Sequence, residues 1–115
     1  MGKFAVGQVV SSYFPFSDLT SKKSRPALIV AHADFDNIIL CQITSKPYSG
    51  SNSIAINRED FADGGLPIDS YIRPDKLFTA ETSIINKVYG TISAEKLKQT
   101  HEVIRALFVD NDSTK

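Results

Sequence analysis

The chain has 115 residues, of which 42 % are hydrophobic and 10 % aromatic, and its 13 basic and 13 acidic side chains give a formal net charge of zero. This composition is enough for a packed globular core and excludes a disordered chain, which combines low hydrophobicity with high net charge. The balanced charge argues against nucleic-acid binding by bulk charge, so such binding would need a local basic patch.

No segment predicts secretion or membrane insertion. The longest apolar runs, 27–31 and 38–41, are far shorter than the roughly 20 residues that cross a bilayer. The N-terminus lacks an apolar signal core, and Val6 stands where a myristoylation signal requires Ser or Thr. The single cysteine, Cys41, lies in an apolar run and is expected to be a small buried residue without a disulfide. We therefore expect a cytoplasmic protein without membrane contact.

Short apolar runs separated by turn signals recur along most of the chain, a pattern typical of an all-β sandwich or barrel. We expect strands over 8–14, 26–31, 38–44, 53–56, 69–72 and 83–89. The runs 26–31 and 38–44 are almost continuously apolar, which predicts two central strands buried on both faces, joined as a hairpin by the turn at 34–37.

After these strands, a helical turn is expected over 58–62, and the Gly64-Gly65 pair predicts a break where positive φ is accessible. The one long helix is expected over 94–109, followed by a polar tail at 110–115. Ser93 is a good N-cap, and the apolar side of this helix consists of Ala94, Leu97, Ile104, Leu107 and Phe108.

The sequence therefore predicts one domain over 1–115. It is mainly β, a small barrel or curled sheet closed by a C-terminal helix.

Three polar clusters interrupt the apolar pattern, and the first is a basic segment before a central strand. Lys22, Lys23 and Arg25 precede Pro26, which forces an extended conformation on Arg25. A guanidinium at a strand entrance can bind a phosphate with two hydrogen bonds. A solvated surface loop is the default for such charges, and the residues alone favour that interpretation.

The second cluster is Thr44, Ser45 and Lys46, at the end of the predicted strand 38–44. Two hydroxyls and an ammonium group can hold phosphate oxygens. Ser and Thr at a strand end equally serve as turn caps.

The third cluster contains Arg73 and Asp75 on either side of Pro74. Residues two apart in an extended segment point to the same side, so a cation and a carboxylate would lie together. A carboxylate can act as a general base and an arginine can stabilise developing negative charge. An ion pair around the proline explains the same residues without chemistry.

Other candidates are weaker. His32 and His101 lack metal-ligand spacing, so no metal or cofactor is expected, and Cys41 has no nearby cation that would make it a reactive thiolate.

Seven segments occur in a particular order from about residue 7 to residue 108: GQVV at 7–10, FPF at 14–16, SRPALIV at 24–30, ILCQITS at 39–45, GLPIDS at 65–70, IRPDKLFT at 72–79 and KVYGTIS at 87–93. Together they resemble the PemK/MazF-type toxins of bacterial type II toxin–antitoxin systems, and the PemK-like branch in particular. The resemblance implies a small SH3-like barrel with a C-terminal helix, usually a homodimer. It also implies metal-independent cleavage of single-stranded RNA, which leaves 2′,3′-cyclic phosphate ends and stops translation, under the control of a cognate antitoxin.

The resemblance also implies roles for individual residues. Arg25, Thr44, Arg73 and Asp75 match the family's catalytic positions, with Asp75 as the candidate base and the two arginines as a cationic clamp. For such an activity, we expect the RNA to be bound by Lys22, Lys23, Ser45, Lys46, Ser70 and Lys76, with the lysines along its phosphate backbone. The first loop, 17–24, contains neither the Glu nor the His that many relatives carry there, so its substrate contacts do not transfer.

Two alternatives remain open on the same fold. One is a toxin that binds a protein target such as DNA gyrase and cuts nothing, and the other is a degenerate barrel that only binds RNA or an antitoxin.

Overall fold

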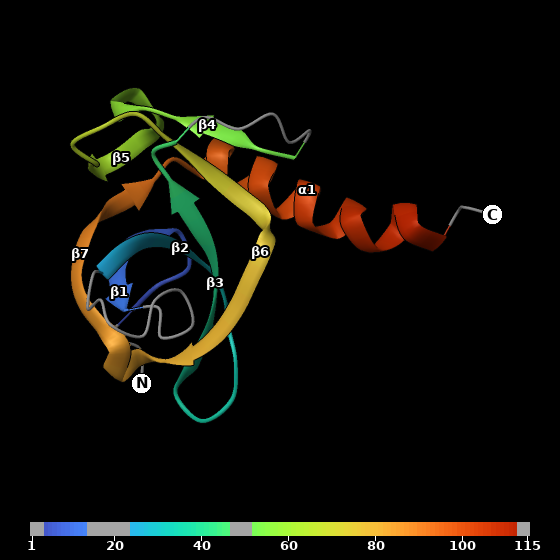
Figure 1. Cartoon of the computed structure of the whole chain (residues 1–115), viewed down its shortest axis with the longest axis horizontal. Coiled ribbons are helices and arrows are strands. Elements are labelled where there is room, and N and C mark those ends of the chain that lie inside the picture. The colour runs from blue at the N-terminus through green and yellow to red at the C-terminus, as the bar shows by residue number, and fades with distance from the viewer. Residues whose placement is uncertain (1–3, 14–23, 47–51, 113–115) are drawn as a thin grey trace.

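The computed structural model describes residues 4–13, 24–46 and 52–112. Within these residues, seven strands form one antiparallel sheet in the order β4-β6-β3-β2-β1-β7-β5, which curls into a partial barrel with one α-helix beside it (Figure 1). The strands are β1 (Gln8–Tyr13), β2 (Ser24–His32), β3 (Asn37–Thr44), β4 (Ile54–Ile56), β5 (Phe61–Gly64), β6 (Ser70–Glu81) and β7 (Ile85–Ile92). The predicted mainly β barrel with a C-terminal helix is confirmed.

Helix α1 (Ala94–Asp112) begins where it was predicted and continues beyond the predicted end. Ser93 caps it, since its Oγ accepts a hydrogen bond of 3.2 Å from the backbone N–H of Lys96. The polar tail was predicted to start at residue 110, but 110–112 are helical, because the segment contains no Gly or Pro to end the helix. No helix in the described ranges is long and apolar enough to cross a membrane.

The apolar side of α1 differs from the predicted one. Leu97, Val103 and Ile104 pack against the core, whereas Phe108 is 66 % exposed. Thr100, a polar residue within this helix, is fully buried and donates its hydroxyl hydrogen bond to the Lys96 carbonyl at 2.9 Å. Figure 1 shows that α1 starts against the sheet and that its last turns extend past it, in agreement with the exposure of Phe108.

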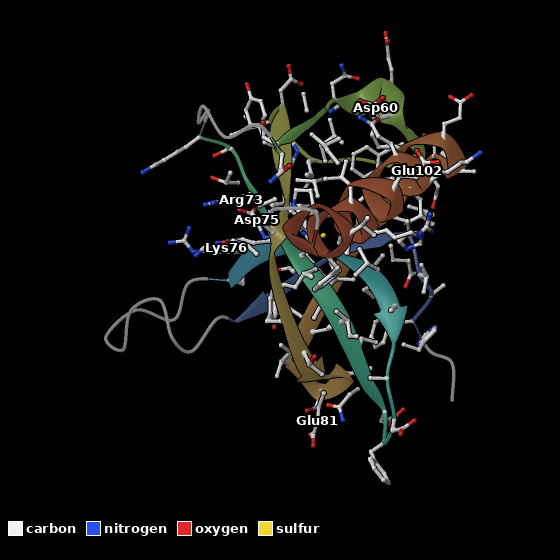
Figure 2. All side chains as sticks on the ribbon, turned by 90° about the vertical axis from the view of Figure 1, so that its right-hand side faces the viewer. Asp60, Arg73, Asp75, Lys76, Glu81 and Glu102 are labelled. Atoms are coloured by element: carbon white, nitrogen blue, oxygen red, sulfur yellow. The ribbon has the colours of Figure 1, made fainter. Side chains whose placement is uncertain are left out.

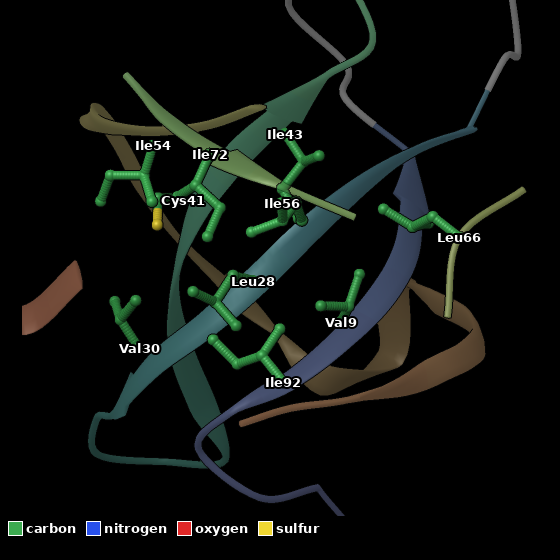
Figure 3. Packing of buried hydrophobic residues seen from close by; sticks show 10 residues of the cluster. All are labelled: Val9, Leu28, Val30, Cys41, Ile43, Ile54, Ile56, Leu66, Ile72 and Ile92. Carbon is green, nitrogen blue, oxygen red and sulfur yellow. The ribbon is translucent and has the colours of Figure 1, made fainter. Parts of the chain in front are cut away.

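Strands β2 and β3 lie in the middle of the sheet and are buried on both faces, as predicted. Alternate residues of β2 enter two different clusters. Leu28 and Val30 belong to the larger cluster, which Figure 3 shows between the curled strands, and Ala27 and Ile29 belong to the smaller one on the other face. The 34–37 turn joins β2 to β3 as predicted, with positive φ at Phe35 and Asp36.

Strand β6 is much longer than the predicted strand 69–72. Gln42 of β3 pairs with Arg73 of β6, but the neighbouring Cys41 pairs with Leu77. Residues 74–76 therefore have no partner in β3 and form a bulge. Pro74 lies in that bulge, where a residue without a backbone N–H leaves no gap in the hydrogen-bond ladder. The predicted strand ended at residue 72, because the continued pairing with β3 from Leu77 onward lies beyond the polar residues around Pro74.

Gly90 was expected to close the region after the predicted strand 83–89. It lies instead inside β7, which starts only at Ile85 after the short helix η2 (Thr82–Ile84). The predicted helical turn at 58–62 is shorter, η1 (Arg58–Asp60), and β5 follows it at once. Gly64 has a φ of 72°, so the positive φ predicted for this pair is confirmed.

Candidate functional site

Strand register brings Arg25 and Thr44 together at one end of the sheet. Ala27 of β2 pairs with Gln42 of β3, and Arg25 and Thr44 each lie two residues beyond this pair in the same direction. Because alternate residues of a strand share a face, both side chains leave the face that holds the smaller cluster. Arg25 is exposed and Thr44 half-buried, so a ligand can reach both.

The same face carries Arg73 from β6. Arg73 pairs with Gln42, in the row next to Thr44, and its Nε lies 3.8 Å from Oδ1 of Asp75. The two side chains are 29 % and 43 % exposed. The prediction that Arg73 and Asp75 lie together is confirmed, and the bulge that contains Pro74 is what turns the two side chains toward each other.

Figure 2 shows Arg73, Asp75 and Lys76 side by side where β6 bends, near the ends of β1 and β2. The structure therefore gathers the four predicted catalytic residues at one end of one face. We call Arg25, Thr44, Arg73 and Asp75 the cationic patch.

The hydroxyl of Thr44 takes part in a turn. Its Oγ1 accepts a hydrogen bond of 3.1 Å from the backbone N–H of Lys46, which is the capping role considered above. The hydroxyl hydrogen can still be donated to a phosphate oxygen, since a hydroxyl both donates and accepts. Ser45 and Lys46 are exposed beside it.

The remaining predicted RNA-binding residues have different placements. Lys76 is exposed next to Asp75. Ser70 is only 5 % exposed and donates its hydroxyl hydrogen bond to the Ile68 carbonyl at 2.9 Å, so its burial argues against the predicted RNA contact. Ser70 is next to Tyr71, whose partner Thr44 belongs to the cationic patch. Because successive residues of a strand point to opposite faces, Ser70 faces away from the patch. Lys22 and Lys23 lie outside the described residues.

Two residues at the patch were missed by sequence reasoning. Ser12 pairs with Arg25, and its Oγ is buried without a hydrogen-bond partner in the part of the chain that the structure describes. Tyr71 pairs with Thr44 on the same face as Arg73. The two-residue alternation that linked Arg73 to Asp75 also points back to Tyr71, whereas Ser12 could be found only from the pairing of β1 with β2.

The other candidates are structural. Burial raises the pKa of the Cys41 thiol to about 12, so it stays protonated and is a poor nucleophile, as predicted. The His101 Nε2 lies 2.9 Å from the Val30 carbonyl oxygen and donates to it, which fixes α1 against β2. Across residues 4–13, 24–46 and 52–112, no group of three His, Cys, Asp or Glu side chains could hold a metal ion.

Comparison with known proteins gives one family. The model of the "PemK-like, MazF-like toxin of type II toxin-antitoxin system" family matches residues 6–108 of the chain. No curated protein sequence matches the chain.

Solved structures share the fold at low sequence identity. A mycobacterial endoribonuclease in complex with its cognate antitoxin is 15 % identical, with a TM-score of 0.69 over 90 % of this chain and 92 % of that one. The Mycobacterium tuberculosis toxin MazF-mt6 is 16 % identical, with a TM-score of 0.69 over 89 % and 96 %. The MazE-MazF structure from Deinococcus radiodurans is 14 % identical, with a TM-score of 0.70 over 91 % and 94 %. At such identities these likenesses concern the fold alone.

Proposed function

We propose that this chain, which belongs to the family of PemK-like, MazF-like toxins of type II toxin-antitoxin systems, is an endoribonuclease that cleaves single-stranded RNA without a metal ion. The observation that carries the proposal is the cationic patch. Two arginines, a hydroxyl and a carboxylate from three strands meet on one accessible face. These are the groups that cleavage by an internal 2′-hydroxyl requires.

Asp75 is the base in this mechanism. Its carboxylate accepts the proton of a ribose 2′-hydroxyl, and the 2′-oxygen attacks the adjacent phosphorus. The bond from phosphorus to the 5′-oxygen then breaks, the 5′-oxygen takes up a proton from water, and a 2′,3′-cyclic phosphate remains. The Arg73 Nε lies 3.8 Å from Oδ1 of Asp75 and orients the carboxylate. Because the Asp75 side chain is 43 % exposed, the substrate can still reach it.

The other patch residues stabilise the transition state. Negative charge grows on the non-bridging oxygens as the phosphorus becomes five-coordinate, and guanidinium groups stabilise such charge through paired hydrogen bonds. Arg25 and Arg73 supply these donors, and Thr44 adds a hydroxyl donor. An arginine stays protonated in proteins, so Arg73 acts through its charge and does not deliver the proton to the 5′-oxygen.

Around the patch, the proposed RNA-binding surface consists of Ser45, Lys46 and Lys76, together with Lys22 and Lys23 from the first loop. We extend the proposal to the protein's partners and surroundings. The mycobacterial neighbour was solved with its cognate antitoxin, and an antitoxin segment that covers the cationic patch of this chain would block RNA. The working form is a homodimer in the cytoplasm.

The test uses purified, antitoxin-free protein with long single-stranded RNA in EDTA. Site-selective cuts that end in 2′,3′-cyclic phosphate are expected, and Arg25→Ala or Arg73→Ala should remove most of the activity. Lys98→Gln is the matched control, because it removes an exposed cation from α1, outside the patch. A folded protein that leaves RNA intact would overturn the proposal and favour a toxin that binds a protein target.

A further inference from the structure

A pocket lies between β5, β7 and the segment that leads into β6, outside the cationic patch. This pocket has a volume of about 420 Å³ and is lined by residues 64–67 together with Arg58, Lys87 and Tyr89. Its volume falls in the range of roughly 300–1,000 Å³ that holds small ligands. We call it the β5–β7 pocket.

The side chains of the pocket combine an aromatic ring with two cations. The Lys87 Nζ lies 4.8 Å from the centre of the Tyr89 ring, and Tyr89 packs against the main core, which holds its ring in place. Arg58 and Lys87 are both exposed. The pocket thus combines an aromatic ring, a cation that lies over it and a second cation in its lining. Aromatic rings and cations are the groups that bind unstacked bases and their phosphates in single-stranded nucleic acid sites.

Glycines allow β5 and β7 to approach each other closely beside the pocket. A β-carbon on Gly64 would clash with the Tyr89 carbonyl oxygen, and one on Gly90 would clash with the Asp63 carbonyl oxygen, so β5 and β7 approach more closely than side chains would allow. A β-carbon on Gly65 would lie 3.6 Å from Cγ of Arg58, which places the arginine stem over this glycine.

Strand register puts the pocket close to the cationic patch. Ser11 of β1 pairs with Pro26 of β2 on one side and with Lys87 of β7 on the other. The backbones of Pro26 and Lys87 are therefore two strand spacings apart, about 10 Å. Arg25 is the residue next to Pro26. The side chains of Arg25 and Lys87 leave opposite faces, so a strand of RNA that touches both must pass around the end of β1.

We propose that the β5–β7 pocket is a subsite for an unstacked nucleotide of the RNA substrate, at some distance along the strand from the scissile phosphate. When RNA binds, the Lys87 ammonium group moves from the Tyr89 ring to a flanking phosphate, and the base stacks on the ring in its place. Arg58 binds a second phosphate. This inference rests on the proposed ribonuclease function and adds a site outside the cationic patch. It predicts that the pocket contributes to the binding of long RNA and not to the chemical step.

The first experiment compares a long single-stranded RNA with a dinucleotide, which is too short to reach both sites. Arg58→Gln/Lys87→Gln should raise KM for the long RNA by about tenfold and leave kcat within about twofold, because it removes binding common to ground state and transition state. Its kinetics on the dinucleotide should match those of the wild type. Lys98→Gln/Arg105→Gln is the control, since it removes two exposed cations from α1. An unchanged KM for long RNA, while Arg25→Ala still abolishes cleavage, overturns the subsite and leaves the proposed function standing.

Direct measurement of nucleotide binding tests the proposed subsite even if the wild-type protein cleaves no RNA. Uridine 5′-monophosphate titrated into isotope-labelled protein should shift the amide signals of Gly65, Lys87 and Tyr89 and leave that of Lys98 in place. Tyr89→Leu, which keeps an apolar side chain against the core, should weaken this binding. Shifts with a glutamate-rich peptide and none with the nucleotide would assign the pocket to an acidic protein segment, and no shift with either probe would also overturn the proposal.

Discussion

Arg73 and Asp75 face each other across Pro74 at the point where β6 leaves the register of β3, with Nε and Oδ1 3.8 Å apart. The bulge is what makes this pair accessible. In a regular ladder the residues after Arg73 would continue to pair with β3, whereas here 74–76 are extra and Asp75 and Lys76 are exposed. Arg73 pairs with Gln42, two residues before Thr44 on the same face of β3. The carboxylate of Asp75, which can accept a proton, therefore shares one surface with three groups that can donate to a phosphate, those of Arg25, Arg73 and Thr44.

Asp75→Asn should reduce the rate of RNA cleavage by about 10²–10⁴-fold, because an amide cannot accept the 2′-hydroxyl proton. Binding of RNA should be kept or slightly tightened, since a negative charge is removed. Single-turnover cleavage and fluorescence anisotropy measure the two effects. Cleavage at the wild-type rate would remove Asp75 from the mechanism.

Lys46→Gln and Lys76→Gln should each lower the salt dependence of RNA binding. One phosphate contact contributes about 0.7 to the slope of log K against log salt for a single strand. The slopes are measured in an Asp75→Asn background so that the RNA stays intact, with Lys98→Gln as the control. If the slopes match the control, these lysines do not contact the phosphate backbone.

Gly90→Ala should destabilise the fold by about 1–3 kcal/mol, because its new β-carbon has to displace the Asp63 carbonyl on β5. Gly65→Ala provides a comparison within the same region, as its β-carbon would meet only Arg58 Cγ at 3.6 Å. Chemical denaturation gives both free energies of unfolding. Equal stability of the two variants would show that β5 and β7 are not in close contact.

Cys41 should make the protein less stable in alkaline solution. Burial raises its folded pKa to about 12 from a usual value of 9.0, so between these values the unfolded chain loses a proton that the folded chain keeps. The free energy of unfolding therefore falls as pH rises above 9, by up to about 1.4 kcal/mol per pH unit from this group. Cys41→Ala should show a shallower decline in denaturation curves across this interval, and identical declines would contradict the burial of the thiol.

Local sequence patterns were enough to predict the fold class, the two central strands, the hairpin between them and the start of α1. Each of these depends on local patterns: continuous apolar runs predict strands buried on both faces, and Ser93 before an acidic turn predicts a helix start. The sequence also singled out Arg25, Thr44, Arg73 and Asp75, since polar residues that interrupt apolar strands stand out, and the resemblance to a toxin family gave them roles.

Which of these residues lie together depends on how distant segments of the chain pair in the folded protein. Arg25 and Thr44 become neighbours through the register of β2 and β3, and Ser12 joins them through that of β1, which no spacing along the chain encodes. Strand β6 continues beyond its predicted end, past the bulge at Pro74, because pairing with β3 resumes at Leu77. The burial of Ser70, the exposure of Phe108 and the β5–β7 pocket depend in the same way on which segments cover one another, and that is set by the packing of the whole chain.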